Sequence, residues 1–290
     1  MAEEQPVAGF QPEQETRDLS FQPVVNPNPK HLTTEHIRFY NEHGYIKPIS
    51  IYDEVEATQN RAYFDRLLDA MRAMKDGRDG NYAINGYHIC CEGLWEIVTH
   101  PLILDCVEDL IGPNIIAWGT HFFCKQPHDP KHVPWHQDAS YWPFTPARTV
   151  TVWLAIDDTD LENSAMLFLP GTHRQGQLKW EQTKKPAVLH QEIVNVAQYG
   201  QPVADELKAG QMSLHADMLA HGSTPSTSAR RRCGLTVRYC PPAVRALDPG
   251  WSKQAILCRG EDPTGNWRHN PRPYSDNLAP DKKPKSIGGN

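Results

Sequence analysis

The sequence predicts an α+β fold in which helices come first and a β-sandwich or small barrel follows. In the first third of the chain, apolar residues recur at the spacing of an amphipathic helix. From Asn114 onward, short β-rich runs such as IIAWGTHFFCKQ and ARTVTVWLAID alternate with turn residues. Helices followed by a series of short strands are typical of an α+β architecture.

Three helices are expected in the first part of the chain. The first extends from the threonine pair 33–34, either of which is a good N-cap, to Gly44. The second covers about residues 56–74, where apolar side chains form one stripe. The third covers about residues 92–110, with a break expected before Pro101.

The proline distribution divides the chain into a core and two ends. Residues 1–31 and 259–290 are rich in proline and show little periodicity, so we expect an irregular arm and an irregular tail. The intervening residues 32–258 then form the folded domain, a length that suits one large domain or two small ones.

The composition excludes several functional classes. Lys and Arg number 29 against 35 for Asp and Glu, a net charge of −6, so a broad basic surface for nucleic acid or anionic membrane is not expected. Mean hydropathy is −0.60, and no apolar run approaches the roughly 18 residues of a membrane span. Because the N-terminus is acidic and the seven cysteines contain no CxxC, we expect a cytoplasmic protein with reduced thiols. Whether it forms a homo-oligomer is left open.

The segment PWHQDASYWPF contains the motif His136-Gln137-Asp138. In an extended segment, residues i and i+2 point to the same face, so His136 and Asp138 can reach one point. His221, at the end of a later β-rich run, is the best candidate for a third ligand. Two imidazoles and one carboxylate form a facial set that leaves positions open on a metal and suits non-haem Fe(II).

Residues close to His221 supply the parts of an anion anchor. Arg232 opens the strand that continues CGLTVRY, and its guanidinium can hold a carboxylate through a bidentate pair. Ser223 can add a hydroxyl to the same carboxylate. A metal triad with such an anchor suits a 2-oxo acid that chelates an iron. Arg230 and Arg231, by contrast, are expected to form a solvated basic turn.

Four motifs in this order carry a family resemblance. They are IGPNI (111–115), PWHQDASYWPF (134–144), VWLAIDDTDLENSAMLFLPGTHRQG (152–176) and HGSTPSTSARRRCGLTVRY (221–239). The segment that they span, about 130 of the 290 residues, resembles the phytanoyl-CoA dioxygenase family of Fe(II)/2-oxoglutarate-dependent oxygenases. HIRFYNEHGYI (36–46) also resembles the family's opening helix and first strand. The implied fold is a double-stranded β-helix, a jelly roll with helices packed on one sheet.

The resemblance implies a metal centre and a reaction. His136, Asp138 and His221 are the implied Fe(II) ligands, and 2-oxoglutarate and O2 are converted to succinate and CO2 while a C–H bond of the substrate is hydroxylated. The family also contains halogenases, in which a small residue replaces the carboxylate ligand. Because Asp138 is present, hydroxylation is the expected outcome.

The resemblance also implies a cosubstrate site. Arg232 pairs with the distal carboxylate of 2-oxoglutarate, Ser223 hydrogen-bonds it, and Trp153 matches an aromatic residue beside it. His121 falls where the family has an apolar side chain, so its role stays open between cosubstrate, substrate and supporting contacts.

Candidate substrate contacts are less specific. Arg238 lies six residues after Arg232, so strand alternation points both side chains the same way. It either anchors an anionic substrate or closes a salt bridge at the end of the barrel. Five further candidates follow the metal motif or lie in the loop before the third helix: Tyr141, Trp142, Phe144, Asn85 and His88.

The substrate class is predicted only in outline. The acidic composition offers no basic patch for a CoA phosphate, which favours a compact zwitterion or anion such as a small phosphonate, betaine or amino-acid derivative. An acyl-CoA or natural-product scaffold is the alternative, with desaturation, epoxidation or cyclisation as other outcomes.

Two further hypotheses concern other classes of protein. One is a jelly-roll binding protein without turnover. The other is a hydrolytic zinc enzyme, a hypothesis that explains neither Arg232 nor Ser223.

Overall fold

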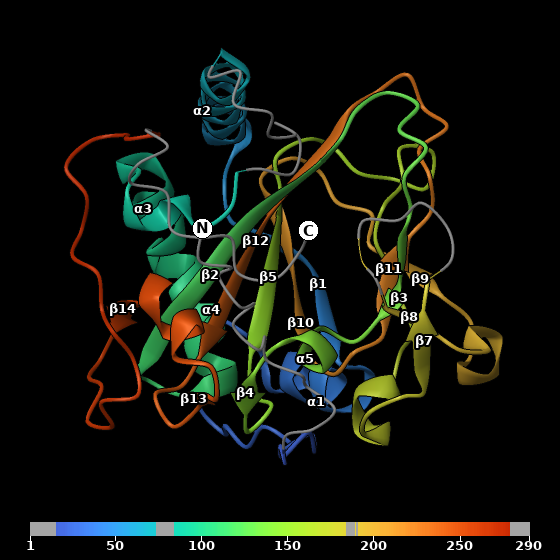
Figure 1. The fold of residues 1–290 in the computed structure, drawn as a ribbon, viewed down its shortest axis with the longest axis vertical. Coiled ribbons are helices and arrows are strands. Elements are labelled where there is room, and N and C mark those ends of the chain that lie inside the picture. Colours follow the sequence, from blue (N-terminus) through green and yellow to red (C-terminus); the bar gives the residue numbers. More distant parts are fainter. Residues whose placement is uncertain (1–15, 74–83, 184–188, 190, 279–290) are drawn as a thin grey trace, which may run out of the picture.

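The computed structural model describes residues 16–73, 84–183, 189 and 191–278. Its strands form a double-stranded β-helix with two main sheets, which stand beside each other in Figure 1. The six-stranded sheet has the order β1-β10-β5-β12-β2-β14, and the four-stranded sheet has the order β3-β11-β6-β9. The expected jelly roll is confirmed.

Most strands are short, as the sequence predicts, although β2 has 11 residues and β12 has 9. Those of the larger sheet are β1 (Tyr45–Ser50), β2 (Ile115–Lys125), β5 (Val150–Ala155), β10 (Gln211–Ala216), β12 (Arg232–Cys240) and β14 (Ile256–Arg259). Those of the smaller sheet are β3 (Val133–His136), β6 (Leu167–Phe168), β9 (Val203–Ala204) and β11 (His221–Ser223). Two ribbons complete the set: β4 (Phe144–Thr145) with β13 (Arg245–Ala246), and β7 (Trp180–Gln182) with β8 (Gln191–Ile193).

The expected helices form, with shifted bounds. They are α1 (Thr34–His43), α2 (Glu54–Ala73), α3 (Glu92–Val98), α4 (Pro101–Ile111) and the one-turn α5 (Asp138–Tyr141). Short 3₁₀ helices occur at η2 (Tyr87–Ile89), η3 (Thr172–Gln175), η4 (Val196–Tyr199) and η5 (Pro249–Gln254). The predicted third helix is two helices because Pro101 begins a new one. The predicted end of the second helix, residue 74, lies outside the described residues.

The ends of α1 show how the sequence determines a helix boundary. Thr33 caps the first turn by accepting a hydrogen bond from the His36 backbone N–H, and the His36 side chain accepts one from the Thr33 N–H. Gly44 ends the helix in the left-handed conformation, with φ of +87°. The chain then enters β1 directly.

The main apolar core lies between the helices and the larger sheet. Buried residues of α2 and α4, such as Phe64 and Val107, belong to one cluster with Phe122, Leu235 and Leu214 of strands β2, β12 and β10. Figure 1 shows α2, α3 and α4 on one side of this sheet, away from the smaller sheet. The opposite face of the larger sheet is therefore left for the pocket described below.

Strand register places side chains of this second face in rows. His215, Thr151 and Arg238 are direct partners across β10, β5 and β12. Partners across an antiparallel pair point to the same side of a sheet, so these three side chains share one end of the face. On β12, Arg232 pairs with Lys125 of β2 at the other end.

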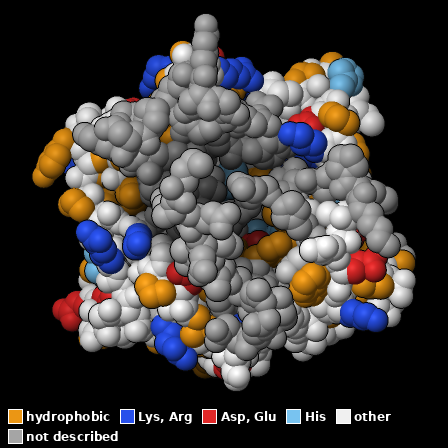
Figure 2. Space-filling model, viewed as in Figure 1, with side chains coloured by type: hydrophobic (Ala, Val, Ile, Leu, Met, Phe, Trp, Pro, Cys, Tyr) orange, Lys and Arg blue, Asp and Glu red, His pale blue; other side chains and the backbone are white. Residues whose placement is uncertain are grey.

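Several features bear on the composition-based predictions. All seven cysteines lie in the described part and are free. Within the same residues, no helix is both long and apolar enough to cross a membrane. On the face shown in Figure 2, acidic and basic side chains of the described residues are interspersed. The described part of the N-terminal arm, residues 16–31, carries no helix or strand.

Candidate metal centre and cosubstrate pocket

Three predicted ligands come together where the smaller sheet faces the larger one. His136 ends β3, and His221 begins β11 directly opposite it in the antiparallel pair. Asp138 is the first residue of α5, two residues after His136. The potential donor atoms of the three residues all lie within 4.8 Å of one another.

Hydrogen bonds orient both imidazoles toward the carboxylate. The Nδ1 atom of His136 is 2.8 Å from the Pro134 carbonyl, and that of His221 is 2.9 Å from the Leu219 carbonyl. A carbonyl only accepts, so Nδ1 carries the proton in each ring and Nε2 keeps its lone pair. The two Nε2 atoms lie 3.5 and 4.0 Å from Asp138 Oδ1, which is the arrangement of metal-binding histidines with oriented outer nitrogens.

Gln137 fixes the loop between the two ligands of the HxD motif. Its side-chain NH2 donates to the Gly176 and Met218 carbonyls, and its oxygen accepts from the Leu178 N–H. The amide is buried, and these bonds satisfy it. The middle residue of the motif thus anchors the chain while its neighbours face the metal position.

The protonation states suit a divalent cation. Burial opposes ionisation of Asp138, but electrostatic interactions with the neighbouring imidazoles of His136, His215 and His221 hold its pKa well below the usual range. Burial lowers the pKa of His221 far below its ordinary value. A carboxylate and a neutral imidazole are the forms that bind metal, and two histidines with one carboxylate fit Fe(II) with open positions. The residues present therefore fit the implied iron.

The predicted cosubstrate residues line one pocket with the triad. Arg232, Ser223 and Trp153 are all part of its wall, together with the apolar side chains Phe123 and Met166. The guanidinium carbon of Arg232 is 5.5 Å from the Trp153 ring centroid. The Ser223 hydroxyl is buried without a hydrogen-bond partner among the described residues, so it has capacity for a ligand oxygen.

Glycine at position 234 makes room for the Trp153 indole. A Cβ at Gly234 would lie 2.1 Å from the Trp153 ring, a separation that two carbon atoms cannot adopt without displacement. Gly234 and Trp153 lie on neighbouring strands, β12 and β5. The glycine in the CGLTVRY run therefore determines where the aromatic wall of the pocket stands.

A buried lysine, absent from the predicted set, supports Arg232. Lys125 is 1% exposed, and its Nζ donates to Ser164 Oγ and to the carbonyls of Lys131 and Thr224. The Ser164 carbonyl in turn accepts two hydrogen bonds from Arg232, at 3.0 and 2.7 Å. Lys125 thus joins three loops around the guanidinium.

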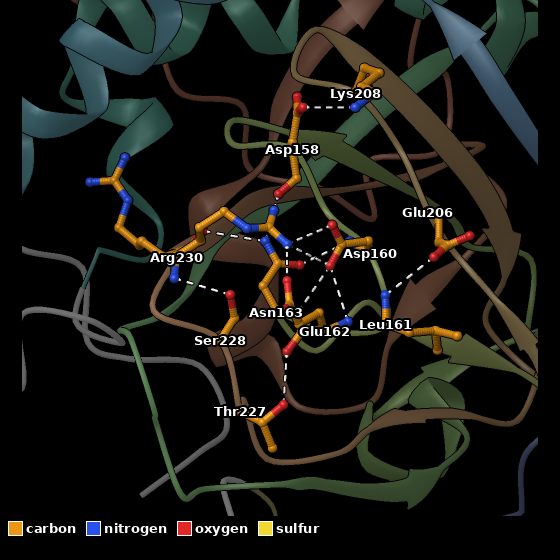
Figure 3. A network of polar contacts seen from close by, with 11 residues as sticks. Asp158, Asp160, Leu161, Glu162, Asn163, Glu206, Lys208, Thr227, Ser228 and Arg230 are labelled. Atoms are coloured by element: carbon orange, nitrogen blue, oxygen red, sulfur yellow. Dashed lines mark hydrogen bonds and ion pairs between the residues drawn. The ribbon is translucent and has the colours of Figure 1, made fainter.

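The loop that carries Ser164 is also held from its outer side. Arg230 contacts both Asp160 and Glu162, and Asn163 caps the same turn by accepting from the Asp160 N–H (Figure 3). Arg230 is as solvated as predicted, with its side chain 47% exposed.

Arg231 differs from the prediction of a solvated turn. Its side chain is 22% exposed and forms ion pairs with Asp157 and Asp65. These two ion pairs connect the start of β12 to α2 and to the segment that follows β5. Of the three consecutive arginines, only Arg230 is solvent-exposed.

Arg238 lines the pocket, whereas the three aromatic candidates after the metal motif, Tyr141, Trp142 and Phe144, are not among its lining residues. The Arg238 guanidinium packs on the rings of Trp142 and Trp118, at 5.4 and 5.6 Å from their centroids. Tyr141 places its ring edge-on to His136 and exchanges hydrogen bonds with the Gln191 backbone. Phe144 packs against Trp118 in the same aromatic cluster.

Arg238 forms no salt bridge with the described residues, which removes one of its two predicted roles. The described part of the chain places no carboxylate oxygen within 4 Å of it. The other role, contact with a ligand, remains a prediction.

The three remaining candidates, His88, Asn85 and His121, are also not among the lining residues of the pocket. The substrate-contact prediction for His88 is corrected: it is fully buried, and its two ring nitrogens contact Thr120 Oγ1 and the Gln254 carbonyl. Burial also lowers its pKa to about 4, as expected for a packed neutral histidine. Asn85 forms a β-bridge with His121, whose ring stacks on Phe123.

His215 and Thr151 also belong to the site, although neither was predicted from the sequence. The His215 Nε2 is 3.8 Å from Asp138 Oδ2, and the Thr151 hydroxyl is 3.4 Å from the same oxygen. Both line the pocket. They come from the middle of apolar strands, and only the strand register reveals that they face the metal ligands.

Two imidazoles, a carboxylate and a buried arginine in one jelly-roll pocket define an Fe(II)/2-oxoglutarate-dependent oxygenase. The chain belongs to the phytanoyl-CoA dioxygenase family, because the family profile matches residues 40–234. Its cofactor is Fe(II), and 2-oxoglutarate and O2 are its cosubstrates.

Individual relatives agree with this membership. The chain is 30% identical to the peroxisomal phytanoyl-CoA dioxygenase of Mus musculus over 286 residues, 88% of this chain and 81% of the relative. It is 28% identical to a probable alpha-ketoglutarate-dependent hypophosphite dioxygenase of Stutzerimonas stutzeri, over 52% of this chain and 54% of that protein. Among solved structures, the non-heme monooxygenase ThoJ superposes with a TM-score of 0.71 and 30% identity, over 82% of this chain and 88% of ThoJ.

Proposed function

We propose that this oxygenase hydroxylates an unactivated C–H bond of a small or medium organic metabolite. 2-Oxoglutarate and O2 are converted to succinate and CO2 in the same reaction. The observation that supports this most strongly is the joint presence of the triad His136, Asp138 and His221 and the Arg232 anchor in one pocket.

The protein's own residues have distinct tasks in this reaction. His136, Asp138 and His221 hold the iron, which supplies the oxygen-activating chemistry when bound. Arg232 and Ser223 hold the distal carboxylate of 2-oxoglutarate, since a guanidinium and a hydroxyl are matched donors for it. This orients the cosubstrate along the Trp153 wall before the reaction begins.

Apolar side chains keep the pocket dry. Phe123, Val133, Met166 and Leu189 line it together with the polar residues. Excluding water strengthens the charge interactions inside the pocket and protects reactive species from side reactions.

Hydroxylation is the proposed outcome because Asp138 occupies the carboxylate position of the triad. Halogenation, known in the resembling family, requires a small residue there. Desaturation, epoxidation and cyclisation begin from the same metal chemistry and are alternative outcomes of the test below.

A compact zwitterion or anion is the proposed substrate, with small phosphonates, betaines and amino-acid derivatives as candidates. Support comes from the polar end of the pocket, where Thr151, His215 and Arg238 lie. The hypophosphite dioxygenase among the relatives is named for a compact anion. The alternative substrate is an acyl-CoA, for which the relative named phytanoyl-CoA dioxygenase gives the precedent.

The test combines Fe(II)-loaded protein, 2-oxoglutarate and air with metabolite pools, and follows succinate formation and product mass. We expect one pool to stimulate succinate formation and to yield a product heavier by one oxygen atom. A product lighter by two hydrogen atoms would indicate desaturation. Zinc rather than iron in the protein as isolated, together with no succinate formed by the Fe(II)-loaded protein, would contradict the proposal. His221→Ala serves as the inactive control.

A further inference from the structure

One end of the pocket contains a polar row that the cosubstrate does not explain. His215, Thr151 and Arg238 are consecutive partners across β10, β5 and β12, and all three line the pocket. Thr151 contacts Asp138 at 3.4 Å, so the row lies at the level of the metal ligands.

Arg238 has donors without partners in this row. Its Nε is buried without a hydrogen bond in the described part of the chain, and no described carboxylate pairs with it. A guanidinium in such a place is normally satisfied by an acceptor. Both ring nitrogens of His215, which is 1% exposed, also lack a hydrogen bond among these residues.

Two tryptophans hold the Arg238 guanidinium in position. Trp118 and Trp142 contact it through their rings, and their own centroids are 4.7 Å apart at 81°. A β-bulge between Arg238 and Tyr239 interrupts the pairing with β2 beside Trp118, and bulges next to active sites re-aim side chains. Cation–π contact orients a guanidinium but leaves its N–H groups available for an anion.

The position of Arg238 separates it from the 2-oxoglutarate anchor. Arg232 and Arg238 lie six residues apart on β12, which corresponds to about 20 Å of extended strand. Of the two carboxylates of 2-oxoglutarate, the distal one is assigned to Arg232 and the one beside the keto group would chelate the iron, so neither needs Arg238 as a partner. Since Arg232 is matched to the distal carboxylate of 2-oxoglutarate, a second anion is needed for Arg238.

We propose that Arg238, with Thr151 and His215, forms a subsite for an oxyanion of the substrate, a carboxylate or a phosphonate, beside the metal. This inference rests on the proposed function and narrows its substrate class to molecules with such a group close to the oxidised carbon. The matched geometry of guanidinium and oxyanion provides both affinity and orientation.

Binding calorimetry under anaerobic conditions tests the subsite without turnover. Fe(II)-loaded protein is saturated with 2-oxoglutarate and titrated with propionate, ethylphosphonate and the neutral twin propionamide. We expect at least one anion to bind wild type more tightly than propionamide. Arg238→Met should weaken that anion about 10- to 100-fold, the loss expected for a charge-assisted hydrogen bond, and Arg238→Lys should weaken it less.

Controls separate this subsite from folding and from the proposed function. Arg245→Met removes an exposed guanidinium on β13 and should leave anion binding unchanged. The melting temperature and 2-oxoglutarate affinity of Arg238→Met should stay close to wild type, which shows that the variant is folded. The response to propionate and to ethylphosphonate tells which oxyanion is preferred.

Three results would overturn the inference. Equal binding of propionamide and both anions to wild type would show that there is no anion subsite. Equal anion binding to wild type and Arg238→Met would place the subsite elsewhere. A selective loss of 2-oxoglutarate affinity in Arg238→Met would assign the arginine to the cosubstrate. If wild type fails to bind 2-oxoglutarate at all, the proposed function itself fails, and the two failures are thus distinguished.

Discussion

His221 on β11 lies directly across the antiparallel pair from His136 on β3, with ring centroids 4.1 Å apart. The two residues are far apart in the sequence and meet only because these strands pair. Asp138 follows β3 after one intervening residue, and Gln137 is bonded on both sides of its amide. The geometry of the metal centre therefore depends on the smaller sheet rather than on a single loop.

Removal of one imidazole should abolish iron binding. With His221→Ala, two of the three ligands remain, and we expect iron content to fall from about one per chain to near zero at equal metal concentration. Metal analysis after desalting measures this. His31→Ala, which removes an exposed histidine far from the triad in sequence, is the control. Full iron content in His221→Ala would show that His221 is not a ligand.

Loss of the Arg232 guanidinium should weaken the binding of 2-oxoglutarate. Arg232→Ala removes the guanidinium proposed for the distal carboxylate, so the 2-oxoglutarate concentration for half-saturation should rise about 10- to 100-fold. Iron content should be retained. Arg230→Ala, whose ion pairs lie at the surface, should stay within about 3-fold of wild type. An unchanged 2-oxoglutarate requirement in Arg232→Ala contradicts the assignment.

Lys125 should contribute both to the stability of the fold and to 2-oxoglutarate binding by Arg232. Lys125→Met removes the donor to Ser164 Oγ and to the Lys131 and Thr224 carbonyls, of which the Thr224 carbonyl keeps another donor, the Ser164 hydroxyl. This should cost about 2–4 kcal/mol in the free energy of unfolding. Because Ser164 also contacts Arg232, 2-oxoglutarate affinity should fall too. Denaturant unfolding and calorimetry measure both effects. Lys208→Met, with its side chain 77% exposed, should cost at most about 1 kcal/mol, and an equal cost in both variants would refute the role of Lys125.

Two glycines of the larger sheet form a matched pair for a packing test. A methyl group at Gly234 meets the Trp153 ring at 2.1 Å, whereas one at Gly119 meets the Arg238 side chain at an ordinary 3.9 Å. Gly234→Ala should therefore destabilise by about 1–3 kcal/mol through overpacking and weaken 2-oxoglutarate binding by displacing Trp153. Gly119→Ala should change stability by less than about 1 kcal/mol. Similar unfolding curves for both variants would contradict this account of the pocket wall.

Asp205 should make stability depend on pH. Burial raises its pKa to about 7, although Ser213 donates a hydrogen bond to it at 2.6 Å. The folded state therefore holds a proton that the unfolded state releases near pH 4, so this stabilisation is lost as pH rises through about 7.

The substitution Asp205→Asn removes that pH dependence. Relative to wild type, the variant should gain up to about 3 kcal/mol in unfolding free energy between pH 5 and pH 8, as measured by urea unfolding at both values. Asp69→Asn, an exposed carboxylate on α2, should show no such difference. A pH-independent difference between Asp205→Asn and wild type would show that Asp205 is ionised in the folded state throughout this range.

The sequence allowed local features and the metal motif to be predicted, because both depend on short spacings. The capping threonine and Gly44 mark the ends of α1, and Pro101 marks the break between α3 and α4. His136 and Asp138 are two residues apart, so their common direction follows from strand geometry alone.

Features that depend on strand register could not be predicted in the same way. His215 and Thr151 face the metal ligands only because β10, β5 and β12 pair in one particular register. Lys125 is buried because three loops converge on it, and a lysine in sequence is ordinarily expected at the surface. The burial of His88 could not be predicted either, because its hydrogen-bond partners, Thr120 and Gln254, come from distant parts of the chain.

The most direct test of the account is anaerobic titration of Fe(II)-loaded protein with 2-oxoglutarate, followed by visible absorption. We expect wild type to show a weak charge-transfer band that saturates at one equivalent of 2-oxoglutarate. The band should be lost in His221→Ala, and it should require more 2-oxoglutarate in Arg232→Ala. Absence of the band in wild type with one iron bound per chain would contradict the assignment of the pocket to this cosubstrate.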